Sequence, residues 1–214
     1  MAANGVEEEM SEKLLNELVG HYSAKGRFYH NLEHIEGMLQ LASQFKEDIE
    51  DLQTLQFSIW YHDVIYNVKR KNNEEKSALL AQQRLSQINY PEKLIQKCHA
   101  QIIATKNHNV STDSTDPDLK YLLDFDLAIL GSEPFIYKEY TQNVREEYSI
   151  YPGFLYRRGR KKVLHQMLEQ DWIYQTTIFR ENFEKLARVN IRDELDHLKS
   201  VSYTHLTLPT IVRV

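Results

Sequence analysis

The sequence predicts an all-α protein, and three observations support that prediction. Only 7 glycines and 5 prolines interrupt the 214 residues, so few positions would break a helix. In most segments the apolar residues recur at spacings of three and four, which is the period of an amphipathic helix. The hydrophobic content of 42% is enough for the core of one compact domain.

Eight to nine helices follow from these patterns. We expect them at about residues 10–20, 31–46, 51–67, 73–88, 91–105, 118–130, 133–149, 160–171 and 174–199. The clearest break is the polar loop 106–117, which closes with Pro117. The pattern therefore predicts a flexible N-terminus over residues 1–9 and one helical domain over residues 10–200.

The last residues, 201–214 (VSYTHLTLPTIVRV), replace the helical pattern with a threonine-rich alternating one. This pattern favours a short strand or a disordered extension. The stretch also resembles a translated cloning artefact, so we treat it as a non-helical, non-native tail and exclude it from the fold prediction.

Composition narrows the classes of function. The single cysteine, Cys98, excludes an internal disulfide and a cysteine-rich zinc site, so any metal would be held by histidines and carboxylates. The net charge is −5 with acids and bases mixed along the chain, which argues against nucleic-acid binding through a broad basic face. We find no run of 18 apolar residues and no secretory signal, and we expect a cytoplasmic protein without a membrane span.

The first candidate motif is FYHNLEH, residues 28–34, which places His30 and His34 four residues apart. On a helix these side chains would point the same way, at the edge of the apolar stripe that follows. That stripe consists of Leu32, Ile35, Met38, Leu39, Ala42 and Phe45. Taken alone, such a pair is more typical of structural histidines than of a metal site.

The second motif is SIWYHDVIYN, residues 58–67, where His62 and Asp63 lie in the middle of an almost entirely apolar predicted helix. An ionised aspartate there is costly unless a cation or hydrogen bonds compensate it. Adjacent helical residues diverge by about 100°, so both side chains would reach one ion only close to the helix. A hydrogen bond from Asp63 to a neighbouring group is the alternative.

The third motif is YLLDFDLAILG, residues 121–131, in which Asp124 and Asp126 are embedded among leucines and isoleucine. Gly131 is placed to end this helix. Buried acids therefore occur in a second predicted helix, and these again need a compensating charge or hydrogen bonds.

In combination, a histidine, a His-Asp pair and a later aspartate, each on its own helix, resemble the HD superfamily of metal-dependent phosphohydrolases. Further segments follow the order found in the predicted HD phosphohydrolases of unassigned substrate, over residues 26–196. These segments are RFYHNLEHIEGML, WYHDVIYN, NNEEKSALLA, LLDFDLAILG, VREEY, GRKKVLHQML and EKLARVN. The resemblance implies an HD-domain helical bundle. It implies a metal bound by His34, His62, Asp63 and Asp126, with Asp124 as the second candidate for the last position.

The segment YHNLEH is also similar to one in the cyclic-nucleotide phosphodiesterases, which are distant relatives within the superfamily. That similarity implies that His30 is a general acid and that His34 binds metal, but it ends with this segment and implies no cyclic nucleotide. Asp63 is the second candidate catalytic residue. Other HD proteins hold a second metal through further histidines. The candidates here for a second metal or for substrate are His99 and His108, together with Asp124.

Mixed nitrogen and oxygen ligands suit Mn, Fe, Co, Ni or Zn better than Mg or Ca, with one or two ions per chain. Such an ion would activate water for attack on a phosphate ester, and His30 would protonate the departing oxygen. The candidates for contact with the substrate phosphate are Lys69, Arg70, Lys71, Arg145 and Arg160; surface charge and ion pairs between helices are the alternatives.

We therefore expect a metal-dependent phosphohydrolase, a phosphomonoesterase or phosphodiesterase, acting on a small phosphorylated metabolite with nucleotides as the favoured class. Its partner would be this substrate, and a homo-oligomer remains open. A di-iron HD-type oxygenase is one alternative. A catalytically silent nucleotide-binding module is another, although its metal ligands would be expected to have degenerated.

Overall fold

The computed structural model describes the backbone of residues 2–108 and 115–203, and the side chains of 9–108 and 115–199. The prediction of an all-α fold is confirmed, because the described residues form ten α-helices, one short 3₁₀ helix and no strand. None of the described helices combines the length and the apolar character that crossing a membrane requires.

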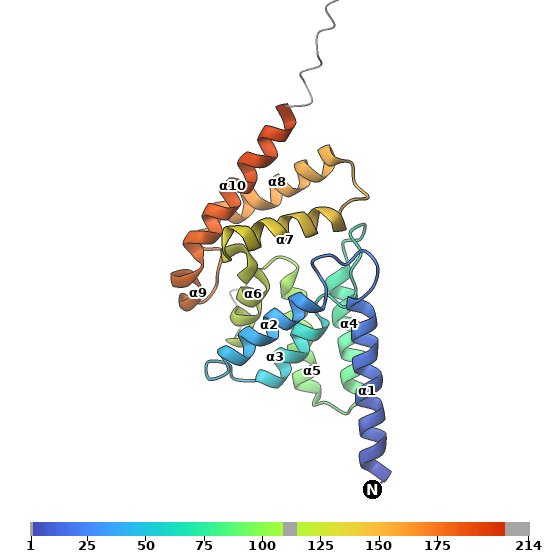
Figure 1. The fold of residues 1–214 in the computed structure, drawn as a ribbon. Coiled ribbons are helices and arrows are strands. Elements are labelled where there is room, and N and C mark those ends of the chain that lie inside the picture. Colours follow the sequence, from blue (N-terminus) through green and yellow to red (C-terminus); the bar gives the residue numbers. More distant parts are fainter. Residues whose placement is uncertain (1, 109–114, 204–214) are drawn as a thin grey trace, which may run out of the picture. The chain divides into compact units, whose positions relative to one another are not determined.

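The helices follow the predicted order closely (Figure 1). They are α1 (Ala2–Tyr22), α2 (Leu32–Gln44), α3 (Leu52–Tyr61), α4 (Asn73–Gln87), α5 (Glu92–Thr105), α6 (Asp118–Leu127), the 3₁₀ helix η1 (Ala128–Gly131), α7 (Pro134–Glu147), α8 (Gly153–Glu169), α9 (Thr177–Asn182) and α10 (Glu184–Tyr203). Two helices begin clearly earlier in the chain than predicted. Helix α1 already begins at Ala2, and α8 begins at Gly153, directly after Pro152, rather than at 160.

The contacts within the chain divide it into two compact units, residues 1–127 and 128–214, and each is described by itself. The sequence had suggested one domain over residues 10–200. Of the predicted tail, residues 201–203 continue α10, and residues 204–214 lie outside the described part of the chain.

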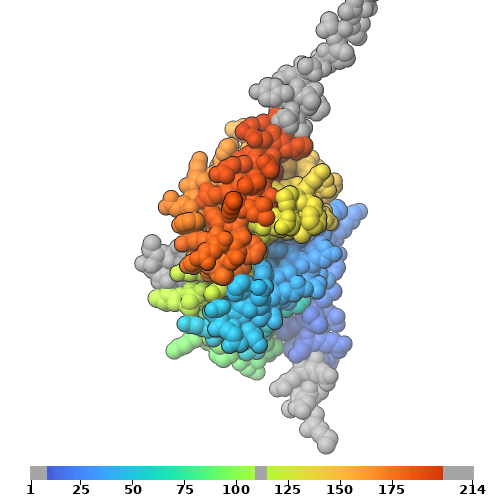
Figure 2. Space-filling model, turned by 60° about the vertical axis from the view of Figure 1, so that its left-hand side comes forward, coloured from blue at the N-terminus to red at the C-terminus, as the bar shows by residue number. Residues whose placement is uncertain are grey.

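In the first unit, α3 contacts α2, α4, α5 and α6. Its apolar residues Leu55 and Ile59 are fully buried. The buried Ser58 hydroxyl donates a hydrogen bond to Gln101 Oε1 (2.6 Å), and the Gln101 amide donates to Asp116 (2.8 Å). The polar groups inside this core are thus paired, as burial requires. The surface of the α2 region is seen in light blue in Figure 2.

Helix α1 is attached to the same unit by two polar contacts. The Arg84 guanidinium on α4 binds the Glu17 carboxylate through two hydrogen bonds of 2.7 Å. The hydroxyl of the buried Tyr22 donates to the carbonyl of Trp60 (2.9 Å), close to the end of α3. The last turn of α1 is therefore fixed beside the residues that follow α3.

In the second unit, α10 packs against η1, α8 and α9. Glu194 on α10 accepts hydrogen bonds from Arg160 (2.8 and 3.0 Å) and from the hydroxyl of Tyr137 (2.6 Å). The amide of Asn190 donates to the carbonyls of Leu130 and Ser132 (2.9 and 2.8 Å). Side chains of α10 thus hold η1 and the helices beside it.

The single helix predicted over residues 174–199 is wrong, because the chain leaves the helical path at Phe183, between α9 and α10. Its φ of −119° and ψ of −28° depart from the usual helical values, although they stay in the right-handed region. Phe183 also lies against Gly131, where a β-carbon would be only 2.7 Å from the Phe183 β-carbon and 2.9 Å from its carbonyl oxygen. The close approach of the two backbones explains a glycine at the end of η1.

This approach predicts that Gly131→Ala destabilises the protein, because the new methyl group meets backbone atoms that cannot move aside easily. We expect a loss of about 1–3 kcal/mol in the free energy of unfolding, measured by urea denaturation. The matched control is Gly159→Ala on α8, where nothing lies within 4 Å and alanine should stabilise by about 0.5–1 kcal/mol. Equal stability of both variants would contradict the packing at Gly131.

Candidate metal centre

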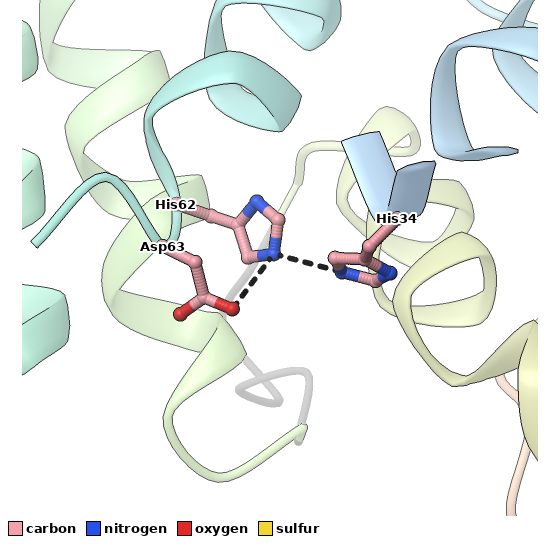
Figure 3. A group of neighbouring side chains, drawn as sticks. All are labelled: His34, His62 and Asp63. Carbon is pink, nitrogen blue, oxygen red and sulfur yellow. Dashed lines mark hydrogen bonds and ion pairs between the residues drawn. The ribbon is translucent and has the colours of Figure 1, made fainter. Parts of the chain in front are cut away.

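Four of the predicted metal-binding residues come together in the first unit. His34 lies on the first turn of α2, His62 and Asp63 directly follow α3, and Asp126 is on the last turn of α6. Figure 3 shows the rings of His34 and His62 turned toward each other with Asp63 beside them. Since α3 contacts both α2 and α6, the packing of the core brings these three segments to one place.

Helix α2 begins one residue later than predicted because Asn31 caps it. The Asn31 side-chain oxygen accepts the backbone N–H groups of Glu33 (2.9 Å) and His34 (3.3 Å), which have no partner inside the helix. His30 therefore precedes the helix, and the expectation that His30 and His34 share one helical turn is wrong. Their rings are nevertheless 6.0 Å apart, centre to centre.

Helix α3 ends at Tyr61, so the prediction that His62 and Asp63 lie in mid-helix is also wrong. The Nδ1 atom of His62 is 2.8 Å from the carbonyl oxygen of Ile59, which a continuing helix would use to accept the N–H of Asp63. A carbonyl oxygen only accepts, so Nδ1 carries the hydrogen and donates it. The imidazole thus competes with the helix for this carbonyl and directs its Nε2 into the site.

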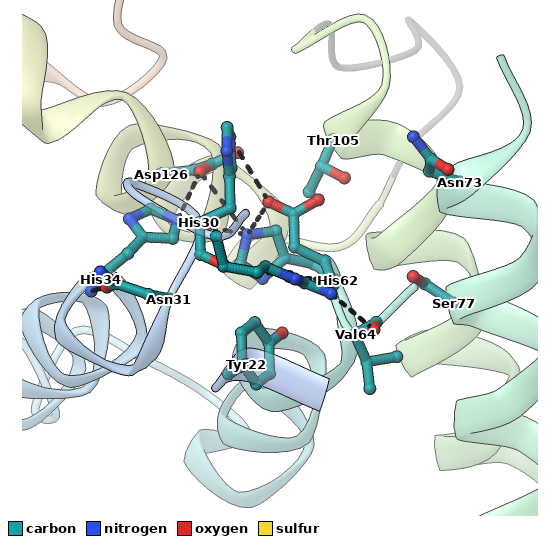
Figure 4. Close-up of polar contacts among 12 residues, drawn as sticks. Tyr22, His30, Asn31, His34, His62, Val64, Asn73, Ser77, Thr105 and Asp126 are labelled. Carbon is teal, nitrogen blue, oxygen red and sulfur yellow. Dashed lines mark hydrogen bonds and ion pairs between the residues drawn. The ribbon is translucent and has the colours of Figure 1, made fainter. Parts of the chain in front are cut away.

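The four side chains surround one point. His62 Nε2 lies 3.4 Å from His34 Nε2, 3.3 Å from Asp63 Oδ2 and 3.6 Å from Asp126 Oδ1. His34 Nε2 is 3.2 Å from the same Asp126 oxygen (Figure 4). The ligand atoms of His34, His62 and Asp63 all lie within 4.8 Å of one another.

These spacings fit a coordinated cation. With metal–ligand bonds of about 2.1 Å, neighbouring ligand atoms are about 3.0 Å apart in an octahedral site and about 3.4 Å apart in a tetrahedral one. Without a cation, hydrogen bonds to the Asp126 carboxylate already join it to both His34 and His62. One cation among them would contact all four at once.

The electrostatics of the site are those of a tight ionic cluster. Burial by itself raises the pKa of a carboxyl, but the imidazoles of His62 and His30 hold the pKa of Asp63 below its usual range. Against the same effect of burial, hydrogen bonds from His108, His34 and His62 keep the pKa of Asp126 well below its usual value. Both carboxylates are therefore ionised at neutral pH.

The two histidines differ. Burial lowers the pKa of His34, although Asp126 opposes this, so the His34 imidazole is neutral at neutral pH. Burial alone would lower the pKa of His62 too, but the Asp63 and Asp126 carboxylates raise it well above its usual value. A cation binding here would take the place of the His62 Nε2 proton.

His30 lies at the edge of this cluster. Its Nε2 is 3.8 Å from Asp63 Oδ2, farther than the four distances of 3.2–3.6 Å given above. Its ring stacks on Tyr66 with centres 4.3 Å apart. The His30 side chain is 21% exposed, against 5% for His34 and 1% for His62. It is thus more accessible to solvent than His34 and His62 are.

Asp126, rather than Asp124, contacts the histidines. Residues two apart on a helix point about 200° away from each other, so Asp124 is turned from the site and is fully buried. The second oxygen of Asp126, Oδ2, is 2.8 Å from Nε2 of His108, whose backbone adopts a positive φ of 49°. His108 thereby joins the site from the loop after α5.

Two further groups of predicted residues lie apart from these contacts. His99 is half-buried on α5, and within the described residues it takes part in none of the contacts above. Lys69, Arg70 and Lys71 are exposed, a few residues beyond the His-Asp pair. They lie on the same segment as Asp63, in the same unit.

The arginines proposed for substrate lie in the second unit and have partners there. Arg145 donates to the carbonyls of Tyr148 (2.8 Å) and Tyr151 (3.3 Å). Arg160 is bound to Glu194 and to the hydroxyl of Tyr140. Both guanidinium groups thus serve the packing of their own unit.

Two residues beside the site were missed by sequence reasoning. Asn31 could have been found, because an Asn directly before a periodic apolar run is a known start signal for helices. Arg27 carried no such signal. Its guanidinium binds backbone carbonyls more than thirty residues away, and no local pattern reveals such a contact.

The cap predicts that Asn31→Ala lowers the free energy of unfolding by about 1 kcal/mol, because two N–H groups lose their acceptor. Asn31→Asp keeps the oxygen and should retain most of the stability. Thermal unfolding of the three proteins at equal metal content checks this. An Ala variant as stable as the Asp variant would argue against the cap.

Four side chains from two helices and the turn after α3, with His30 at the edge and His108 on Asp126, thus form a candidate metal centre. Comparisons with protein-family models, with curated proteins and with solved structures gave no match.

Proposed function

We propose that the chain is a metal-dependent phosphohydrolase of the HD type, acting on a small phosphorylated metabolite such as a nucleotide. The observation that carries the proposal is the convergence of His34, Asp63 and Asp126 on His62, whose Nε2 lies 3.3–3.6 Å from an atom of each of them, with His34 Nε2 3.2 Å from Asp126 Oδ1. The order of these residues along the chain is that of the resemblance to HD phosphohydrolases, and their geometry supports the same assignment.

The four residues would hold one divalent transition metal. Two imidazole nitrogens and two carboxylates form the mixed set of ligands that suits Mn, Fe, Co, Ni or Zn. The hydrogen bond from His62 Nδ1 to the Ile59 carbonyl supports this role, because a fixed second nitrogen orients a histidine ligand. When bound, such an ion supplies Lewis acidity and lowers the pKa of water.

His30 would act on the leaving group. It is next to the cluster but less buried, and its position is fixed by the stacking on Tyr66. A protonated imidazole at this point can donate its Nε2 hydrogen to the oxygen that departs from phosphorus. Asp63 Oδ2, which lies 3.8 Å away, would help to orient the ring for this transfer.

Exposed cations near the site would bind the rest of the substrate. Lys69 and Arg70 follow the His-Asp pair and are exposed, so they are available to an anionic ligand. Their side chains can therefore serve as phosphate contacts, in contrast to Arg145 and Arg160.

One observation favours a second candidate, oxygen activation at a two-metal site. His108 lies 2.8 Å from the Asp126 oxygen that faces away from His34, so this carboxylate has histidines at both oxygens. Two irons per chain, together with oxygen consumption, would support the oxygenase. A single metal with phosphate release supports the hydrolase.

The choice between the two aspartates can be tested by a matched pair of variants. Asp126→Asn removes a ligand charge, and we expect at least a tenfold weaker affinity for Mn²⁺ or Co²⁺ by titration calorimetry. Asp124→Asn has the same chemistry two residues away and should leave the affinity within about twofold. The reverse ranking would assign the ligand to Asp124.

The two histidines of the first motif should separate metal binding from proton transfer. His30→Asn should retain the metal, measured by elemental analysis, while turnover falls by about 10²–10⁴-fold. His34→Asn should lose the metal itself. If His30→Asn keeps full turnover on the substrates of the wild type, His30 is not the acid.

The activity itself is tested with the purified protein loaded with Mn²⁺ or Co²⁺. We expect release of phosphate or of a nucleotide from at least one substrate in a panel of nucleotide mono-, di- and triphosphates, cyclic nucleotides and dinucleotides. The Asp63→Asn protein, prepared in parallel, controls for contaminating phosphatases. Equal activity in both preparations, or none in either, would count against the proposal.

A further inference from the structure

We propose that Arg27 is a positioning residue that holds the His30 segment and the His-Asp turn in place before a metal ion binds. Its effect on metal affinity rests on the function proposed above. Its effect on the order of the metal-free protein does not.

The contacts of Arg27 join two segments that are far apart in the sequence. Nη1 donates to the carbonyl of Asp63 (2.7 Å) and to that of His30 (3.0 Å), and Nη2 donates to the carbonyl of Val64 (2.8 Å). The close-up in Figure 4 shows the bond that ends at Val64. One planar group thus binds the backbone of the candidate acid and that of a candidate ligand.

Aromatic rings fix the guanidinium itself. Its central carbon is 5.0 Å from the centre of the Tyr22 ring and 5.3 Å from that of Tyr66. Tyr22 is buried and hydrogen-bonded to the Trp60 carbonyl, and Tyr66 stacks on His30. Arg27 therefore reaches His30 by two routes, through its carbonyl and through Tyr66.

The local backbone explains why an arginine is useful here. Because the chain turns away after α3, the carbonyls of Asp63 and Val64 have no place in a continuing helix and need other donors. The guanidinium supplies several donors in a rigid plane, and its charge suits the negative end of a helix. Lysine has one nitrogen and cannot reach three carbonyls in the same way.

Order established in advance would strengthen metal binding. If the two segments moved freely, a metal ion would have to fix them at the cost of part of its binding free energy. With Arg27 in place, that entropy is lost during folding. Removal of Arg27 should therefore weaken metal binding although Arg27 contacts no ligand atom.

The experiment compares Arg27→Met, Arg27→Lys and the control Arg84→Met with the wild type, all as full chains. Arg84 is a suitable control because its guanidinium likewise joins two separate segments, here α4 and α1. Its two hydrogen bonds go to Glu17 and involve none of the cluster residues. The measurements are amide hydrogen exchange of the metal-free proteins and Co²⁺ affinity, with the visible absorption of bound Co²⁺ reporting its ligand geometry.

We expect at least tenfold faster exchange in peptides covering residues 62–67 of Arg27→Met, about tenfold weaker Co²⁺ binding and an altered absorption spectrum. Arg27→Lys should fall between this variant and the wild type. Arg84→Met should match the wild type in Co²⁺ affinity and spectrum, even where it lowers the melting temperature.

The inference would be overturned if Arg27→Met exchanged its amide hydrogens and bound Co²⁺ as the wild type does. It would also be overturned if Arg84→Met lost as much Co²⁺ affinity as Arg27→Met. If the wild type itself binds no Co²⁺, the proposed function fails. In that case the exchange data alone decide the role of Arg27, with faster exchange supporting it and unchanged exchange refuting it.

Discussion

The hydrogen bond between His62 Nδ1 and the Ile59 carbonyl is the contact on which the candidate site depends. It occupies the carbonyl oxygen that would accept the N–H of Asp63 if α3 continued, and the helix ends there. Two adjacent residues that would diverge by about 100° on a helix can then direct their side chains toward one point. The same bond fixes which nitrogen of His62 faces the site, because the donating Nδ1 leaves Nε2 for a ligand.

The packing of the first unit supplies the rest. Helix α3 lies in contact with α2 and α6, so His34 and Asp126 are brought to the end of α3 without any need for a long loop. Two ionised carboxylates in so buried a place would repel each other and lose hydration. The neighbouring imidazoles of His34, His62 and His108 offset part of that cost, and a divalent cation would offset more. A metal ion bound by these four side chains, as we propose, would therefore also stabilise the unit.

Much of the fold could be predicted because the spacing of apolar residues along a helix can be read from neighbouring positions in the sequence. Spacings of three and four located nearly every helix, and Gly131 correctly marked the end of η1. The predicted end of α3 was wrong, and so was the single unbroken helix predicted over 174–199. Both errors have the same cause, a contact with a distant or neighbouring backbone group. His62 bonds to the Ile59 carbonyl in one case, and the chain at Phe183 lies against Gly131 in the other. The spacing of apolar residues reveals neither contact.

The residues of the candidate site followed from the resemblance, whereas their arrangement did not. We expected three helices to bring together His34, His62, Asp63 and Asp126. In the structure two helices and the turn after α3 do so. Asn31 was readable as a cap, while Arg27 was not, because its partners are carbonyls that any sequence would have. A charged residue that binds backbone leaves no pairing pattern in a single sequence.

The most direct test of the account is a crystal structure of the protein with Mn²⁺ or Co²⁺, with the ion located by its anomalous scattering. The account predicts a peak about 2.0–2.3 Å from His34 Nε2, His62 Nε2 and one oxygen each of Asp63 and Asp126. A peak at any other position, or none among these four residues at saturating metal, would contradict it.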